Sequence, residues 1–466
     1  MQSTGCPKLD EDFAAFHALA HLNPATAQEL AGALGAAYTR LLTADLDDYD
    51  IPAIREHADH ALDDMFLLRV ALRDRIAEWH SQSLLDDEAE RNLRGVFRIG
   101  RYATDMLTEL IVGTETTAAD NTPKDLRAFT GEPLTTLINP RHRTDNGFEF
   151  KSGDVLLVRG SLSTSAAIAR IGDIDSQFSH VGVVHIGADG QPNIVEALIE
   201  KGAVVSPLEA ALTHGLGRAV LLRPRDPELG QAAAEWVKTH VDASNTRHAP
   251  HIPYDFTMEI PNYTSLFCSK LVRLAYDKAS DGKVDLPLFA TELSMSNRDF
   301  VDRIGVTART TFAPGDLELD PHFDVVAEWR DVRKTSNLRL QDALMDKLFA
   351  WMDNHGYVYR ESFKPWIVSV LGRTSSYLPS AVKGMLVKVG VPEVPRNMQR
   401  QTISAIAMLT WTSGPIVGEL EKRDGETRKH AKRPMHLRDV YTLLEDVRIR
   451  EGARIGYLVK PLKRRG

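Results

Sequence analysis

The chain changes from helix-like to strand-like sequence at Lys151 and returns to helix-like sequence after Asp331. Between these points lie short runs rich in Val, Ile and Leu and bounded by Gly, Pro, Asp or Ser, which predict strands at 154–159, 180–186, 193–198, 218–223 and 324–330. Helical spacing predicts helices among them at 207–212, 227–241 and 265–278. This mixture predicts an α+β domain built on an antiparallel sheet.

The two flanks of this domain are predicted to be helical. Apolar residues recur at helical spacing in both, and a helix at 338–355 would end at Gly356. Turn-forming sequence from Gly113 to Phe148 predicts a linker or arm. We therefore expect four parts: a helical region at 1–115, a linker at 116–150, the α+β domain at 151–332, and a second helical region at 333–466.

Composition excludes several classes of protein. The net charge of −8 argues against a dedicated nucleic-acid binder, whose surface would be basic. No basic segment followed by an apolar run marks a signal peptide, so we expect a cytoplasmic protein, or one exported by a route without a cleaved signal. No apolar run reaches the roughly 18 residues that a membrane-spanning helix needs.

Charge is distributed unevenly between the two ends. Residues 1–64 hold 12 acidic and three basic residues, whereas residues 421–466 hold 14 basic and seven acidic ones. This asymmetry is compatible with contact between the ends, with a basic tail for an anionic surface, or with two solvated faces. Two solvated faces are the simplest interpretation and the one we expect.

The chain has two cysteines in different surroundings. Cys6 is expected in a frayed N-terminus, so a disulfide with Cys268 is not expected. Thr264 or Ser265 would cap the helix that follows and place Cys268 in its first turn. Free N–H groups and the helix dipole there stabilise a thiolate nucleophile and an oxyanion. The alternative is that Cys268 is simply a small buried residue.

A histidine and a carboxylate lie on neighbouring predicted strands. His180 is suited to act as the general base for Cys268, and Glu196 would orient the imidazole. His185, five residues further on, falls on the opposite face of the strand and is expected to take no part.

The length of the turn between these strands decides whether the triad forms. A two-residue turn at Asp189-Gly190 would place His180 and Glu196 on opposite faces of the sheet. The triad therefore requires a longer loop or a bulge between Ile186 and Asn193.

The motifs, taken in order, resemble a known family. They are Gly153-Asp154, Ser179-His180-Val181-Gly182, Glu196, Tyr254-Asp255 and Phe267-Cys268-Ser269-Lys270-Leu271-Val272. This order resembles the circularly permuted, NlpC-type papain-like cysteine hydrolases, the YiiX-like proteins and their relatives among the lecithin:retinol acyltransferases. In ordinary papain-like enzymes the cysteine precedes the histidine. Pro314-Gly315-Asp316-Leu317 and Val326-Ala327-Glu328-Trp329 extend the resemblance to Asp331, so it covers under half of the chain.

The resemblance implies roles for individual residues. Cys268 would be the nucleophile, His180 the base and Glu196 the third member of the triad. Tyr254 falls where the family often has an active-site tyrosine. Lys270 departs from the family's common Cys-Ser-Glu pattern, and we expect it to face away from the site.

Other signals favour neither a metal nor a cofactor. His57-x-x-His60 and His248-x-x-His251 have a spacing that suits a metal, but no Cys or Glu completes a familiar arrangement, so we assign no metal and no cofactor. The apolar stretch Trp366–Val391 predicts either core helices or an interfacial, lipid-contacting surface. The basic C-terminal residues would favour anionic lipid head groups in the same way.

The sequence therefore predicts a cysteine acyl hydrolase or acyltransferase that works through an acyl-thioester. We expect lipid esters as substrates, with peripheral membrane contact, because no wall-binding module is recognisable and the Trp366–Val391 stretch is apolar. The alternatives are an amidase or endopeptidase acting on cell-wall or other peptides, and an inactive papain-like binding module. A bacterial effector toxin with a neutralising partner or a delivery protein is a further possibility.

Overall fold

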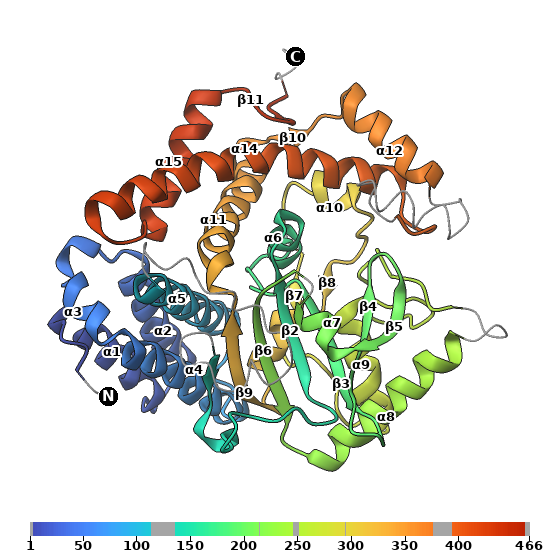
Figure 1. Ribbon diagram of the computed structural model, residues 1–466, viewed down its shortest axis with the longest axis horizontal. Coiled ribbons are helices and arrows are strands. Elements are labelled where there is room, and N and C mark those ends of the chain that lie inside the picture. Colours follow the sequence, from blue (N-terminus) through green and yellow to red (C-terminus); the bar gives the residue numbers. More distant parts are fainter. Residues whose placement is uncertain are drawn as a thin grey trace.

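The computed structural model describes residues 3–112, 136–213, 215–245, 251–293, 295–375 and 394–461. Figure 1 shows a sheet in the middle, the N-terminal helices at one side of it, and the C-terminal helices along the top. The mixture of helices with an antiparallel sheet confirms the predicted α+β class. No helix in these ranges is long and apolar enough to cross a membrane.

The N-terminal region is helical, as predicted. Its helices are α1 (Pro7–Ala20), α2 (Ala27–Leu42), α3 (Ile51–Glu56), α4 (Ala58–Ser81) and α5 (Asp87–Val112). Thr26 caps α2 by accepting a hydrogen bond from the Glu29 N–H. The expectation of a frayed N-terminus at Cys6 is wrong, because Cys6 immediately precedes α1, is 1% exposed and accepts a hydrogen bond from the Asp50 N–H at 3.4 Å. Both cysteines are free and buried.

The main sheet has seven antiparallel strands in the order β1-β9-β6-β2-β3-β4-β5. The strands are β1 (Thr136–Ile138), β2 (Val155–Gly160), β3 (His180–Ile186), β4 (Pro192–Leu198), β5 (Gly202–Pro207), β6 (Leu216–Pro224) and β9 (Phe323–Arg330). All five predicted strands are present. Strands β5 and β1 were not predicted from the sequence, and β1 lies within the segment predicted as a linker. The part of that segment from 113 to 135 lies outside the described residues.

Five helices accompany the sheet: α6 (Ser163–Arg170), α7 (Leu208–Thr213), α8 (Pro227–Ser244), α9 (Cys268–Ala279) and α10 (Asp299–Arg303). The Gly153-Asp154 motif fixes two of them. A Cβ on Gly153, whose φ is +88°, would lie 2.4 Å from the Cα of Gly230 in α8, so only glycine fits there. The Tyr276 hydroxyl of α9 donates to the Gly153 carbonyl at 2.6 Å. This motif therefore holds both helices against the start of β2.

The chain leaves the sheet through short elements and continues into the C-terminal region. The short elements are β7 (Thr291–Glu292), β8 (Thr310–Thr311) and the 3-10 helix η4 (Pro314–Leu319). The C-terminal region contains α11 (Val332–His355), β10 (Val358–Tyr359), α12 (Phe363–Ser375), α14 (Arg400–Ala431), α15 (Leu437–Glu451), β11 (Arg454–Ile455) and β12 (Leu458–Val459). Gly356 ends α11 with a φ of 70°, as predicted. Residues 376–391 of the predicted apolar stretch lie outside the described residues.

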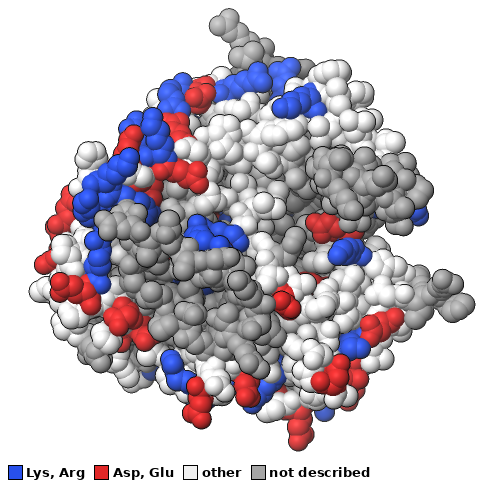
Figure 2. Space-filling model, in the orientation of Figure 1, with Lys and Arg blue, Asp and Glu red and all other residues white. Residues whose placement is uncertain are grey.

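The acidic N-terminal and basic C-terminal regions contact each other. Arg433 pairs with Asp47 at 3.0 Å and Arg438 with Asp45 at 3.3 Å, while the Arg55 guanidinium donates to the Lys432 carbonyl at 2.8 Å. In Figure 2, Lys and Arg of the C-terminal helices lie next to Asp and Glu along the same edge of the molecule. The expectation of two separately solvated faces is therefore wrong at these positions.

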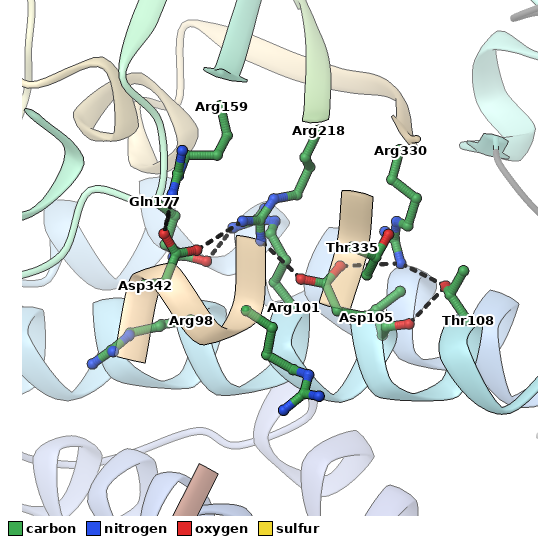
Figure 3. Close-up of polar contacts among 12 residues, drawn as sticks. Arg98, Arg101, Asp105, Thr108, Arg159, Gln177, Arg218, Arg330, Thr335 and Asp342 are labelled. Atoms are coloured by element: carbon green, nitrogen blue, oxygen red, sulfur yellow. Dashed lines mark hydrogen bonds and ion pairs between the residues drawn. The ribbon is translucent and has the colours of Figure 1, made fainter. Parts of the chain in front are cut away.

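Three neighbouring strands place buried arginines in one row. Arg218 of β6 is the cross-strand neighbour of Arg159 in β2 and of Arg330 in β9. Figure 3 shows the row facing acidic side chains of α5 and α11. Asp342 of α11 pairs with Arg159 at 2.6 Å and with Arg218 at 3.3 Å, and Asp105 of α5 pairs with Arg218 at 3.2 Å. Burying this much positive charge is tolerable only because each guanidinium has an anionic partner.

The carboxylate of Glu328 in β9 forms ion pairs with arginines of the N-terminal helices. The carboxylate is 1% exposed and pairs with Arg69 of α4 at 2.7 Å, with Arg101 of α5 at 3.2 Å and with Arg330. Burial alone would raise the pKa of Glu328, but the three arginines hold it well below its usual range. The N-terminal helices are thus attached to the sheet through buried ion pairs.

We predict that Glu328→Ala strongly destabilises the protein. The substitution leaves three buried guanidinium groups without their shared anion, which is expected to cost about 3–5 kcal/mol of unfolding free energy. The control is Glu419→Ala, because Glu419 pairs with Arg450 at 2.8 Å but both side chains are exposed, so its loss should cost under about 1 kcal/mol. Urea unfolding followed by circular dichroism measures both; equal midpoints would contradict the prediction.

Candidate functional site

His180 and Glu196 lie on one face of the sheet and contact each other. The register pairs Glu196 of β4 with Gly182 of β3, and residues two apart on a strand share a face, so Glu196 is the diagonal neighbour of His180. The His180 Nε2 and Glu196 Oε2 atoms are 2.7 Å apart. The carboxylate is 6% exposed, so this contact orients the ring in a largely dry environment.

A five-residue loop produces this register. Strand β3 ends at Ile186, β4 begins at Pro192, and these two residues pair. Within the loop, the Gly187 N–H donates to the Gln191 carbonyl at 3.0 Å and the Gly190 N–H donates to the Gly187 carbonyl at 2.9 Å. The longer connection that the triad required is therefore present, and the two-residue turn is not.

Cys268 is the first residue of α9, not a residue inside a side-chain-capped turn. Phe267 is the N-cap residue, and no side chain in the described part of the chain caps the helix. The expectation that Thr264 or Ser265 would cap α9 is wrong: the Thr264 hydroxyl donates instead to the Asn262 Oδ1 at 2.8 Å. The backbone N–H groups in the first turn of α9 are therefore not occupied by a side-chain cap. The positive end of the helix dipole lies at the same place, at the start of the helix beside Cys268.

His180 and Cys268 share a hydrogen bond, and each shifts the pKa of the other. Burial alone would raise the pKa of the Cys268 thiol, but the hydrogen bond and charge of His180, with smaller contributions from Ser269 and the Val181 N–H, lower it. Burial alone would lower the pKa of His180, but hydrogen bonds to Cys268 and Glu196 raise it to about 10. Both shifts favour a thiolate beside an imidazolium over the neutral thiol and imidazole.

The end of the β3–β4 ladder helps to hold the thiolate. The pairing of β3 with β4 extends to Gly182 and Glu196 and does not include Val181. The Val181 N–H can therefore donate to Cys268, and this contact adds to the larger effects of His180 and Ser269 in lowering the thiol pKa. In a regular sheet the Val181 N–H would instead donate to the neighbouring strand.

Tyr254 lies beside the nucleophile. Its backbone bridges to Leu266 in parallel fashion, two residues before Cys268, and its side chain is 5% exposed. Burial and the nearby negative charges, that of Cys268 first among them, raise the pKa of Tyr254 well above its usual range. The phenol therefore keeps its proton and can donate a hydrogen bond to an anion that forms at Cys268.

Lys270 is buried and carries a contact that the sequence did not predict. Its Nζ pairs with Asp255 Oδ2 at 2.7 Å, and the exposed fractions of the two side chains are 0% and 5%. Asp255 also accepts hydrogen bonds from the N–H and the hydroxyl of Thr257. Asp255 directly follows Tyr254 in the chain. This ion pair therefore links residues 254–256, the tyrosine segment, to the helix that bears Cys268.

The C-terminal region holds the other side of the tyrosine segment. The Asn397 side chain donates to the Tyr254 carbonyl at 2.7 Å. Val394, Met398 and Ile403 form a small apolar cluster that packs against Phe256 and Ile199. Asn397 was not predicted as part of the site, because its partner lies 143 residues away and no local pattern links the two.

The N-terminal region reaches the turn that leads into His180. Arg101 donates to Gln177 Oε1 at 2.7 Å, and Gln177 has a positive φ of 62°. Figure 3 shows both side chains in the network between α5 and the sheet. The approach to His180 is therefore fixed by the same helix that binds Glu328.

His185 and His251 do not join the site. His185 bonds instead to Glu235 of α8 at 2.9 Å, on the face opposite His180, as its position in the strand predicts. The ring of His251 bonds to Asn245 Oδ1 at 2.7 Å and to the Lys201 carbonyl, and His248 lies outside the described residues. Among the described residues, no group of three or more His, Cys, Asp or Glu side chains is placed to hold a metal ion.

Comparison with known families agrees with this geometry. Residues 149–327 match the family model described as permuted papain-like amidase enzyme, YaeF/YiiX, C92 family. The middle of the chain is similar to permuted papain-like amidases. The match supports a cysteine hydrolase, and it includes all four predicted site residues: His180, Glu196, Tyr254 and Cys268. No curated protein matches the chain. The relationship to NlpC-type proteins and lecithin:retinol acyltransferases stays a prediction.

We predict that Cys268 remains reactive below the usual thiol pKa of about 8.5, because His180 stabilises the thiolate. The rate of Cys268 alkylation by iodoacetamide, followed by mass spectrometry from pH 5 to 10, measures this. His180→Ala should move the midpoint upward past the usual value, since burial is then unopposed. His185→Ala is the matched control and should leave the midpoint unchanged. A wild-type midpoint at or above the usual thiol pKa would contradict the assignment.

Proposed function

We propose that the protein is a cysteine hydrolase that cleaves acyl ester or amide bonds through an acyl-thioester on Cys268. The observation that carries this proposal is the position of the His180 ring, which bonds to Glu196 on one side and to Cys268 on the other. Each of these contacts has a catalytic purpose in thiol hydrolases: the carboxylate orients the ring, and the ring supplies and removes protons.

In the first half of the reaction, the Cys268 thiolate attacks the carbonyl carbon of the substrate, and the carbonyl π electrons move onto oxygen. The free N–H groups at the start of α9 and the Tyr254 hydroxyl are the donors for that oxyanion. The tetrahedral intermediate collapses, the bond to the alcohol or amine breaks, and the His180 imidazolium gives its proton to the leaving group. The product is an acyl-thioester and a neutral imidazole.

In the second half, neutral His180 takes a proton from water as the water oxygen attacks the thioester carbonyl. Collapse of the second tetrahedral intermediate expels Cys268 as the thiolate and releases a carboxylic acid. His180 is again an imidazolium, held by Glu196 at 2.7 Å, so the resting ion pair is restored. An alcohol or amine acceptor in place of water would give acyl transfer by the same steps.

Separate observations bear on whether the cleaved bond is an ester or an amide. The word amidase in the description of the matched family supports an amide bond. The expected lipid ester uses the same thioester chemistry, and peptides of the cell wall are the second amide class. The hydrogen bond between Cys268 and His180 argues against the inactive binding module. An effector role, a neutralising partner and a delivery protein stay predictions.

We predict that Cys268→Ala abolishes hydrolysis, because no other group at the site can form the thioester. The matched control is Cys6→Ala, which removes the other buried cysteine and should leave activity intact. Mass spectrometry of lipid and cell-wall fragment pools, incubated with each variant, measures the products; the intact mass of the protein measures the acyl adduct.

Tyr254→Phe in the same assay removes one oxyanion donor and should lower kcat about 10²-fold, with Cys268 alkylation unchanged. Equal product formation by wild type and Cys268→Ala would contradict the proposal. Loss of alkylation in Tyr254→Phe would show that the tyrosine supports the thiolate and not the oxyanion.

A further inference from the structure

Helix α12 packs with its small residues inward and its large apolar residues outward. Pro365, Ser369 and Gly372 form its buried side, and a Cβ on Gly372 would lie 3.3 Å from Ile403. On the outer side, Phe363 is 74% exposed, Trp366 46% and Leu371 63%. A surface helix of a globular protein normally has its large apolar residues facing the protein core. The outer face of α12 is therefore suited to contact with another apolar environment.

The outward residues form one patch. Phe363 and Trp366 stack with ring centroids 6.1 Å apart. Leu371, eight residues after Phe363, lies about 80° around the helix from it at about 100° per residue, and the half-buried Ile367 and Val370 fall between Leu371 and Trp366, so these residues cover one broad arc of α12. Leu67, Leu162 and Ile449, the other exposed large hydrophobics among the described residues, lie on other elements. Isolated exposed apolar residues are ordinary, whereas a cluster on one helix marks a contact surface.

The charges on α12 are exclusively positive. Lys364 and Arg373 are its charged residues, and it has no acidic one. The Lys364 ammonium lies 4.3 Å from the ring centre of Trp411, and the neighbouring acid Glu361 is already paired with Arg400 at 2.8 Å. In Figure 2 the surface above α12 is largely uncharged. Outward aromatic and aliphatic side chains flanked by cations are the pattern of helices that lie in the interface of an anionic bilayer.

Helix α12 is connected to the candidate active site through successive layers of side chains. Helix α12 packs on Ile403 and Val394, and these pack against Phe256 and Ile199. Phe256 is two residues from Tyr254, and their rings are 5.1 Å apart. The buried side of α12 is therefore linked by continuous side-chain contacts to the segment that carries Tyr254.

We propose that α12 adsorbs onto an anionic lipid bilayer and that the substrate of Cys268 is an acyl lipid taken from that surface. The substrate part rests on the proposed function, whereas the adsorption part does not. The aromatic pair anchors at the level of the head groups, Leu371 enters the acyl region, and the exposed Lys364 contacts lipid phosphates.

Vesicle sedimentation of the full chain tests the adsorption. The probes are phosphatidylcholine vesicles and vesicles of phosphatidylcholine with phosphatidylglycerol. We expect binding to the anionic vesicles that weakens with salt. The triple variant Phe363→Ser, Trp366→Ser, Leu371→Ser should lose about 10²-fold or more in partition coefficient. The matched control, Leu67→Ser, Leu162→Ser, Ile449→Ser, removes three exposed apolar side chains elsewhere and should bind as wild type does.

Cys268→Ala separates this proposal from the proposed function. It should bind vesicles as wild type does but release no fatty acid from them. Unchanged binding by the α12 triple variant, or no binding of wild type to either vesicle, overturns the adsorption. Self-association of wild type through α12, abolished in the triple variant without any vesicle binding, also overturns it. Vesicle binding without acyl release supports the adsorption and counts against a lipid substrate.

Discussion

The proposed chemistry depends on the interaction of a His180 imidazolium with the carboxylate of Glu196 and the thiolate of Cys268. Neither anion is stable alone in a buried site, and the shared cation stabilises both. The arrangement needs a five-residue loop after β3 to set the register, and it needs α9 to begin at Cys268 itself. The chemistry thus depends on two local features of backbone geometry.

The helical flanks contribute to this site through buried polar contacts. Arg101 of α5 bonds to Gln177 ahead of His180 and to Glu328 in the sheet, so the N-terminal region helps to position His180. Asn397 of the C-terminal region bonds to the Tyr254 carbonyl, and Lys270 holds Asp255 beside it. The family match covers residues 149–327, so Arg101 and Asn397 are additions by the flanks to a permuted papain-like core. We infer that the three regions act as one catalytic unit.

Hydrophobic period, a local signal, predicted five strands of the main sheet and the helical character of both flanks, but it missed β1 and β5. The order of the motifs suggested the grouping of His180, Glu196 and Cys268 through a family resemblance, and it left open whether His180 and Glu196 share a face of the sheet. Local sequence did not predict which residue caps α9, since Thr264 finds a nearer partner in Asn262. It placed Cys6 in a frayed end, although α1 is anchored by burial. The arginine row and the Asn397 contact join residues far apart in the chain, and such pairings follow from the tertiary fold alone.

The protonation state of His180 tests the central claim most directly. Nitrogen-15 NMR of histidine-labelled protein at pH 7.5, assigned with His180→Gln, reports whether one or both ring nitrogens carry a proton. Both should be protonated in wild type, because the pKa of His180 is raised to about 10 and its charged form persists below that value. Alkylation of Cys268 should return the ring to one proton by removing the thiolate. A neutral His180 ring in the unmodified protein at this pH would contradict the account.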